Sequence, residues 1–308
     1  MVPLIPILYL ISFSLLVYRI ANITSKKEAA ILAAFIVFGA ALALYQSTNA
    51  LLFVSIVILF DLITAKYGSR EGLFFVVLGF AYFIVSLYSG IAVYLIAQAM
   101  LLGLAPDAIL KGLKAHKVSS KKTETSRDIV QIAFGILVIA MFHFLRPELS
   151  ESVMITLILL GYLAVNYGIV RKETNLAKRL YALEREYTSL GEGATWLALG
   201  SLAAIGFVFH VKYMMIIFSA IFIADALATI IGIRAKGMKL PYNKKKSAAG
   251  TIAYFAVVAI IPYLLYGVIA LPVAIIAAFV ESLPLKLDDN LSVPVVLVVL
   301  HFLLRFLQ

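Results

Sequence analysis

Apolar stretches long enough to cross a lipid bilayer recur along almost the whole chain. A helix needs about 20 such residues to cross the hydrocarbon core. We expect spans at about 2–18, 28–45, 50–64, 72–88, 90–105, 129–145, 152–169, 193–209, 213–232, 249–268, 270–282 and 291–305. Because only 14% of the residues are charged, a soluble globular domain is excluded. The sequence therefore predicts an all-α, polytopic integral membrane protein with about 12 spans.

The positions of the basic residues predict how the chain is oriented in the membrane. If the long apolar run 72–104 is split at Ser89 and Gly90, all but three of the 26 Lys and Arg residues fall in alternate loops. The exceptions are Arg146, Lys212 and Arg305. The positive-inside rule places the lysine- and arginine-rich loops in the cytoplasm. This placement accounts for most of the net charge of +10, so we predict contact with membrane lipids and no nucleic-acid partner.

A polar segment rich in Lys and Ser separates two groups of spans. We predict an amino-terminal bundle of about five helices at 1–106, a cytoplasmic linker at 107–127, and a second membrane domain of about seven spans at 128–308. The segment 270–282 is short for a span and is interpreted as re-entrant or tilted. The oligomeric state does not follow from the sequence.

Asp225 lies inside the apolar run 213–233 and is the main candidate for a functional residue. A carboxylate at bilayer depth is energetically expensive, and such residues commonly mark functional sites. The competing interpretation is a structural hydrogen bond to a neighbouring span. A basic loop follows, from Arg234 to Ser247, and it would lie at the cytoplasmic face.

Further acidic residues occur near the end of the chain, on the same predicted face. Glu281 ends one apolar segment, and Asp288, Asp289 and Asn290 precede the last span. Carboxylate and amide oxygens suit Mg²⁺, and lysines can neutralise phosphates. Together they would stabilise the charge that develops in phosphoryl transfer. Asp225 could hold the metal or take a proton from an attacking alcohol.

Simpler interpretations exist for two of these elements. Acidic residues favour the amino-terminal end of a helix, so Asp288 and Asp289 could cap the last span. The triplet Lys244, Lys245 and Lys246 could be a solvated positive-inside loop.

Three motifs in series resemble the family of CTP-dependent lipid-alcohol kinases, which includes dolichol kinase, phytol kinase and yeast-type diacylglycerol kinase. The motifs read Ala224-Asp225-Ala226, Lys246-Ser247-Ala248-Ala249-Gly250-Thr251, and Glu281-Ser282-Leu283-Pro284 followed by Asp288-Asp289-Asn290. The resemblance covers about residues 125–308. It identifies the second membrane domain as similar to a polyprenol kinase.

The resemblance implies a kinase that transfers the γ-phosphate of CTP to a long-chain isoprenoid alcohol of the dolichol or polyprenol type, with Mg²⁺ as cofactor. Asp225 and Glu281 are then the candidate catalytic residues. The candidate metal ligands are Asp225, Asp288, Asp289 and Asn290. The candidate nucleotide- and phosphate-binding residues are Lys239, Lys244, Lys245, Lys246, Ser247, Gly250 and Thr251.

The chain departs from the family pattern at three places. The family's Arg-Lys-x-x-His appears as Arg127-Asp128-Ile129-Val130-Gln131, an alanine (Ala249) replaces an acid, and Ala224 replaces a glycine. These changes are compatible with an altered substrate, a divergent branch or an inactive scaffold.

Two other activities stay open at this point. A cytidylyltransferase acting on a lipid phosphate would use similar acidic and basic elements. A secondary transporter would also combine many spans, an intramembrane acid and a broken helix.

Overall fold

A computed structural model describes residues 7, 10, 14–17, 19, 23, 25–46, 50–66, 68–114, 124–183, 190–235, 238–267 and 271–306. Within these residues the regular elements are helices, apart from an isolated antiparallel bridge between Lys239 and Ser247. The predicted all-α class is confirmed.

Six of the described helices are long and apolar enough to cross a membrane. They are Arg70–Tyr88, Val93–Gly112, Arg127–Phe144, Pro147–Val170, Val211–Arg234 and Asp289–Phe306. Shorter apolar helices occur at Leu52–Ala65, Ala248–Ile261 and Leu271–Ser282. An integral membrane protein fits these helices. The count of about 12 stays a prediction, and most of the expected first span, 2–18, lies outside the described residues.

The chain forms two compact units. The first comprises Met1–Ala115 and Ile155–Leu180, and the second comprises His116–Met154 and Tyr181–Gln308. The predicted linker at 107–127 begins within a helix that ends at Lys114, and 115–123 lies outside the described residues. The predicted division into domains at this linker stays a prediction.

The first unit is built around two largely buried helices, Ala50–Ala65 and Val93–Lys114, which pack against each other. Its helices are α2 (Lys26–Gln46), α3 (Ala50–Ala65), α4 (Arg70–Tyr88), α5 (Val93–Lys114), most of α7 (Pro147–Val170) and most of α8 (Asn175–Leu183). α3 packs against α2, α4 and α5. The predicted break at Ser89 and Gly90 is confirmed, because α4 ends there and Gly90 has a positive φ of 75°.

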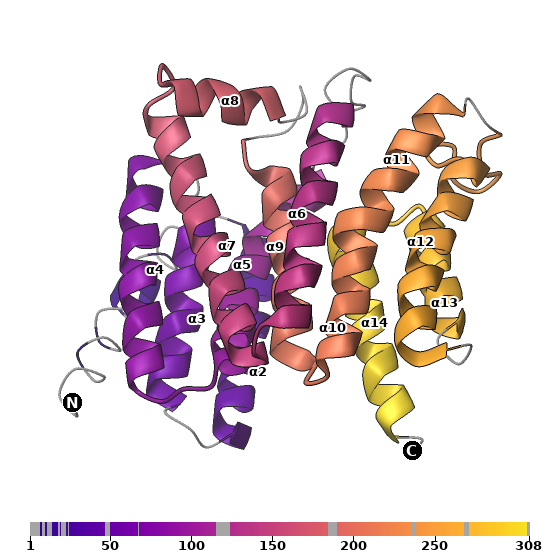
Figure 1. Ribbon diagram of the computed structural model, residues 1–308. Helices are drawn as coiled ribbons and strands as arrows, with labels where there is room; N and C mark the ends of the chain where they lie inside the picture. Colours follow the sequence, from indigo (N-terminus) through magenta and orange to yellow (C-terminus); the bar gives the residue numbers. More distant parts are fainter. Residues whose placement is uncertain are drawn as a thin grey trace. The chain divides into compact units, whose positions relative to one another are not determined.

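The second unit carries the residues of the candidate site. Its helices are α6 (Glu124–Phe144), α9 (Glu192–Phe207), α10 (Val211–Phe218), the π-helical turn η1 (Ser219–Ala224), α11 (Asp225–Arg234), α12 (Ala248–Tyr266), α13 (Leu271–Ser282) and α14 (Asp289–Phe306) (Figure 1). α10, η1 and α11 follow one another as a single rod, and this rod packs against α6, α12 and α14. Its side chains from Tyr213 to Phe222 are buried, as expected for the centre of a bundle.

α13 is too short to cross a bilayer on its own. Its 12 residues rise about 18 Å, whereas the hydrocarbon core is about 30 Å thick. It packs between α12 and α14, and its carboxyl-terminal end carries Glu281. This length agrees with the interpretation of 270–282 as a re-entrant or tilted segment.

We predict that Gly103→Ala destabilises the first unit. A Cβ atom at Gly103 would meet the Val57 carbonyl, Cβ of Phe60 at 2.6 Å and the Asp61 nitrogen at 2.8 Å, and none of these atoms can move without shifting α3. Forced overpacking costs about 1–3 kcal/mol, so the melting temperature of the detergent-solubilised protein should fall.

Gly161→Ala is the matched control for this substitution. Gly161 lies in α7 with nothing within 4 Å of its added Cβ. Alanine there should leave the melting temperature unchanged or raise it, because alanine is favoured over glycine in helices by about 0.5–1 kcal/mol. Equal melting temperatures for both variants would contradict the packing described for α3 and α5.

Candidate metal and phosphate site

Asp225 is the first residue of α11 and directly follows the π-helical turn. Its backbone N–H donates to the carbonyl of Ala220, five residues earlier, rather than four as in an α-helix. One extra residue in a turn rotates the following side chains by about 100° around the helix axis. Such turns are frequent at functional sites. The π-helical turn therefore sets the direction in which the Asp225 side chain points away from the rod formed by α10, η1 and α11.

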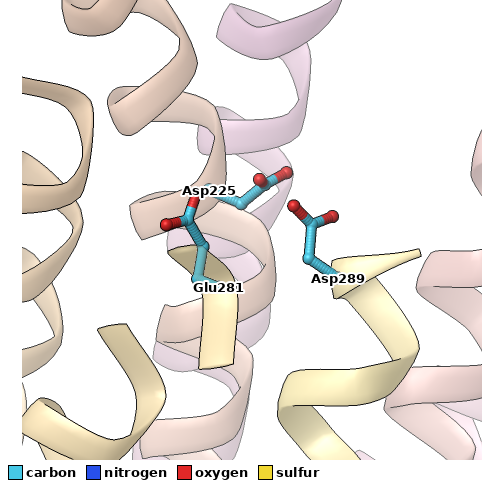
Figure 2. Close-up of side chains that lie close together, drawn as sticks. All are labelled: Asp225, Glu281 and Asp289. Carbon is cyan, nitrogen blue, oxygen red and sulfur yellow. The ribbon is translucent and has the colours of Figure 1, made fainter. Parts of the chain in front are cut away.

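Glu281 and Asp289 join Asp225 from two other helices. Glu281 lies at the end of α13, and Asp289 begins α14 after a short connection, so the two are brought to the same place. One carboxylate oxygen of each of the three residues lies within 4.8 Å of those of the other two (Figure 2). Glu281 is only 3% exposed. Three acids in this arrangement repel one another unless cations neutralise them.

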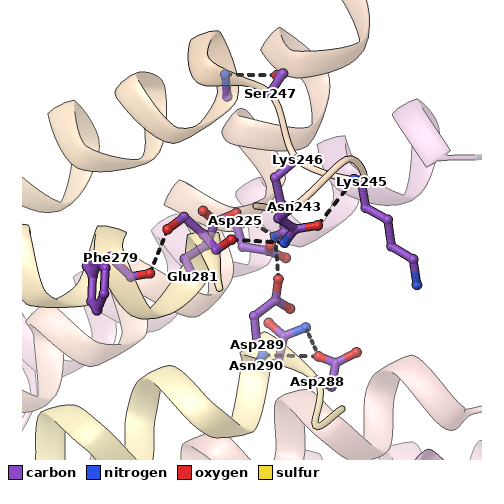
Figure 3. Close-up of polar contacts among 12 residues, drawn as sticks. Asp225, Asn243, Lys245, Lys246, Ser247, Phe279, Glu281, Asp288, Asp289 and Asn290 are labelled. Carbon is purple, nitrogen blue, oxygen red and sulfur yellow. Dashed lines mark hydrogen bonds and ion pairs between the residues drawn. The ribbon is translucent and has the colours of Figure 1, made fainter. Parts of the chain in front are cut away.

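Lys246 supplies one positive charge to this cluster. Its Nζ lies 2.5 Å from Oε1 of Glu281 and 2.6 Å from Oδ2 of Asp289 (Figure 3). Burial alone would lower the pKa of Lys246, but the carboxylates of Asp289, Glu281 and Asp225 outweigh it and raise the pKa above the usual lysine value. Lys246 is therefore a permanent ammonium at physiological pH.

The loop that carries Lys246 is folded against the end of α13. Backbone hydrogen bonds close it into a turn, from Leu240 N to Lys246 O (3.1 Å) and from Ala248 N to Met238 O (3.0 Å). The side-chain amide of Asn243 donates to the Ser282 carbonyl at 2.9 Å. The Tyr242 hydroxyl lies 2.9 Å from Oγ of Ser282. These contacts hold Lys246 next to Glu281.

The other predicted phosphate-binding lysines lie outside this cluster. Lys239, Lys244 and Lys245 are exposed, and the Lys245 side chain leads away from the carboxylates (Figure 3). Nζ of Lys239 donates to the Lys245 carbonyl at 3.5 Å. Of the four lysines, the structure thus brings Lys246 into contact with the acids, and the other three form a basic surface beside it.

Ser247, Gly250 and Thr251 lie in the first turn of α12. Oγ of Ser247 caps the helix by accepting from Gly250 N at 3.2 Å. A Cβ atom at Gly250 would meet the Ala228 carbonyl at 2.9 Å, so this glycine allows α11 and α12 to approach closely. Oγ1 of Thr251 is buried without a hydrogen-bond partner in the part of the chain that the structure describes.

Asp288 and Asn290 form the start of α14. Oδ1 of Asp288 accepts from the backbone N and from Nδ2 of Asn290, at 3.0 and 2.9 Å. Asp288 thus has the geometry of the helix cap that the simpler interpretation expected, whereas Asp289 contacts Lys246.

The residues of this cluster fit a divalent cation. With all acids ionised, Asp225, Glu281 and Asp289 carry two more negative charges than Lys246 neutralises. Oε2 of Glu281 and Oδ1 of Asn290 are buried without a hydrogen-bond partner among the described residues, although buried oxygen atoms are normally satisfied. Hard oxygen atoms of this kind are the ligands that Mg²⁺ prefers.

Two contacts in the site were not expected from the sequence. Gln131 was noted only as a departure from a family pattern, yet its Nε2 lies 3.3 Å from Oδ2 of Asp225. Asn243 was not singled out. An asparagine between a proline and three lysines is typical of a turn, but its bond to Ser282 depends on a residue 39 positions away.

Comparison with known proteins identifies relatives of this chain. It is 32% identical, over 178 residues, to an uncharacterized protein of Methanocaldococcus jannaschii, covering 56% of this chain and 88% of that protein. The chain belongs to the same family as this archaeal protein. No family model and no solved structure matches the chain.

Two plant relatives have names that describe an activity. The chain is 31% identical over 191 residues to probable phytol kinase 3, chloroplastic, of Glycine max, covering 55% of this chain and 59% of the soybean protein. It is 38% identical over 97 residues to farnesol kinase, chloroplastic, of Arabidopsis thaliana, covering 26% and 32% of the two chains. The chain thus spans less than two thirds of either plant relative. The names of these two plant proteins describe kinases of phytol and of farnesol, which are both prenyl alcohols.

We predict that Lys246→Met lowers the stability of the second unit. The Lys246 side chain is 28% exposed, but Glu281 is buried, so removing the ammonium leaves a buried carboxylate without its partner and should cost about 1–3 kcal/mol. The melting temperature of the purified protein should therefore fall, and added Mg²⁺ should restore part of the loss by neutralising the carboxylates.

Lys245→Met is the matched control, because Lys245 is exposed one residue earlier in the same loop. Exposed substitutions usually change stability by less than about 0.5 kcal/mol. A Lys246→Met protein as stable as the Lys245→Met protein would contradict the role of the ion pair.

Proposed function

We propose that this protein transfers the γ-phosphate of CTP to the hydroxyl of a long-chain isoprenoid alcohol of the dolichol or polyprenol type. The single observation that carries the proposal is that Asp225, within the rod Val211–Arg234, lies close to Glu281 and Asp289 at the ends of two other helices, with Lys246 in contact with the latter two. The names of the two plant relatives support the prenyl-alcohol class. CTP as donor rests on the family resemblance of the sequence motifs.

Asp225, Glu281 and Asp289 would hold Mg²⁺, and Asn290 offers a further oxygen. Mg²⁺ held by these residues would supply positive charge that offsets the negative charge developing on the phosphates during the transfer. Lys246 contacts two of the same carboxylates, and its ammonium would attract a phosphate of a nucleotide bound at this site. The basic surface of Lys239, Lys244 and Lys245 would attract the nucleotide to the site.

The acceptor alcohol would approach Asp225 from the membrane. Asp225 lies within the apolar helix Val211–Arg234, whereas Lys246 belongs to a polar loop. The alcohol oxygen forms a bond to the γ-phosphorus, the bond from this phosphorus to the bridging oxygen breaks, and CDP leaves. The carboxylate of Asp225 takes the proton of the alcohol.

We predict that purified protein transfers label from γ-labelled CTP to a polyprenol and that chelation of Mg²⁺ abolishes the transfer. Asp225→Asn should lower kcat/KM by at least about 100-fold, because it removes both a metal ligand and a proton acceptor. Glu148→Gln alters an exposed acid outside the site and should retain wild-type activity.

The position of the label separates this activity from its competitors. Label entering the lipid from the α-phosphate of CTP would identify a cytidylyltransferase instead. Absence of transfer to polyprenol, phytol, farnesol and diacylglycerol alike would refute the proposal.

We also predict that the site opens to the cytoplasm. The chain contains no cysteine, so single introduced cysteines can be labelled selectively. Lys245→Cys should react with a membrane-impermeant maleimide in vesicles whose cytoplasmic face is outward and be protected in right-side-out vesicles. Lys212→Cys, an exposed position on the opposite predicted side, should show the reverse. Labelling of both from one side would overturn the predicted orientation.

A further inference from the structure

Gln131 reaches from α6 to the central rod of the second unit and contacts Asp225 directly. It is 8% exposed. Its Nε2 donates to the carbonyl of Ile221 at 2.8 Å and to Oδ2 of Asp225 at 3.3 Å. Both partners are acceptors, so the amide nitrogen must face them and the amide oxygen must point away. The Gln131 side chain thus makes hydrogen bonds both to the Ile221 carbonyl in η1 and to the Asp225 carboxylate that follows η1.

The π-helical turn explains why Ile221 can accept this bond. In a regular α-helix the N–H of Asp225 would donate to the carbonyl of Ile221, four residues earlier. Here that N–H donates to Ala220 instead. The Ile221 carbonyl accepts from Gln131, and the departure from α-helical geometry is stabilised by a bond from another helix.

A close approach of the two elements brings Gln131 within reach. Gly135 lies one turn further along α6, and a Cβ atom there would meet Cβ of Phe222 at 2.5 Å and Cγ1 of Ile223 at 3.0 Å. The rings of Phe134 and Phe222 make an edge contact with centroids 5.3 Å apart. The absence of a side chain at Gly135 therefore sets the distance between Gln131 and Asp225.

A hydrogen bond to one oxygen fixes the rotation of a carboxylate, so the direction of the second oxygen is fixed as well. Partners of this kind orient metal-ligating side chains in many proteins. Gln131 does this without adding charge, which matters because Lys246 already pairs with the other two acids. The bond from Gln131 accordingly leaves the excess negative charge of the cluster available to a divalent cation.

We infer that Gln131 is a positioning residue that holds the Asp225 carboxylate in the orientation needed to bind a divalent cation together with Glu281 and Asp289. The inference rests on the proposed function for the identity of that cation as the one used in catalysis. It also gives position 131 a defined part in the site, although the sequence departs there from the family pattern.

Direct binding of Mn²⁺, followed by the electron paramagnetic resonance signal of the free ion, tests the inference without relying on activity. Gln131→Met keeps the length and volume of the side chain but removes the donor. We expect its Mn²⁺ dissociation constant to rise about 10–100-fold, as for other residues that orient metal ligands. Gln131→His retains an N–H donor and should bind Mn²⁺ more tightly than Gln131→Met.

Gln98→Met is the matched control, because it makes the same change at a buried glutamine of α5 in the first unit. It should leave Mn²⁺ binding unchanged. If Gln131→Met does not fold, Gly135→Ala decides the question, because it keeps the glutamine but moves α6 away from η1 and should weaken Mn²⁺ binding in the same direction.

The outcomes distinguish this inference from the proposed function. Wild-type Mn²⁺ affinity in folded Gln131→Met would overturn the positioning role, whatever the enzyme activity. Weakened binding in that variant, combined with no phosphoryl transfer from CTP by the wild-type protein, would support the positioning role and refute the kinase proposal.

Discussion

The contact of Lys246 with Glu281 and Asp289 is the interaction on which the candidate site depends. Three carboxylates within 4.8 Å of one another cannot remain ionised in an apolar bundle without a compensating cation. Lys246 lies in a loop that Asn243 and Tyr242 hold against the end of α13 by hydrogen bonds to Ser282. The position of the loop against α13 therefore determines whether the carboxylates are neutralised. If the ammonium of Lys246 is removed, their negative charges are left uncompensated.

Much of the fold follows from the sequence because hydropathy reports directly on burial in a membrane. The predicted spans at 28–45, 50–64 and 72–88 correspond closely to α2, α3 and α4, and the break at Gly90 follows from the need for a turn within an overlong apolar run. Helix α8 was not predicted, since it is short and amphipathic, and a search for long apolar runs passes over it. The π-helical turn was also missed, because its sequence is as apolar as the α-helices on either side.

The sequence predicted most of the residues of the candidate site, but it did not predict which of them contact one another. Asp225, Glu281 and Asp289 were all singled out, and the structure gathers them. Asp288 was grouped with the metal ligands, but the structure places one of its oxygens on the backbone and amide of Asn290. The sequence could not separate two adjacent aspartates, because their roles depend on which one faces Lys246. Likewise, the role of Gln131 depends on a carbonyl 90 positions away.

The position of Gln131 in α6 has a consequence for how the protein is made. Synthesis proceeds from the amino terminus, so α6 is complete before Asp225 enters the membrane. Lys246, Glu281 and Asp289 all emerge after it. During that interval Asp225 lies in an apolar helix before the nearby ammonium of Lys246 has been made, which is a costly situation for insertion. Gln131 is already present at that stage. Its side-chain amide can serve as a provisional hydrogen-bond partner for Asp225 until the last helix is inserted.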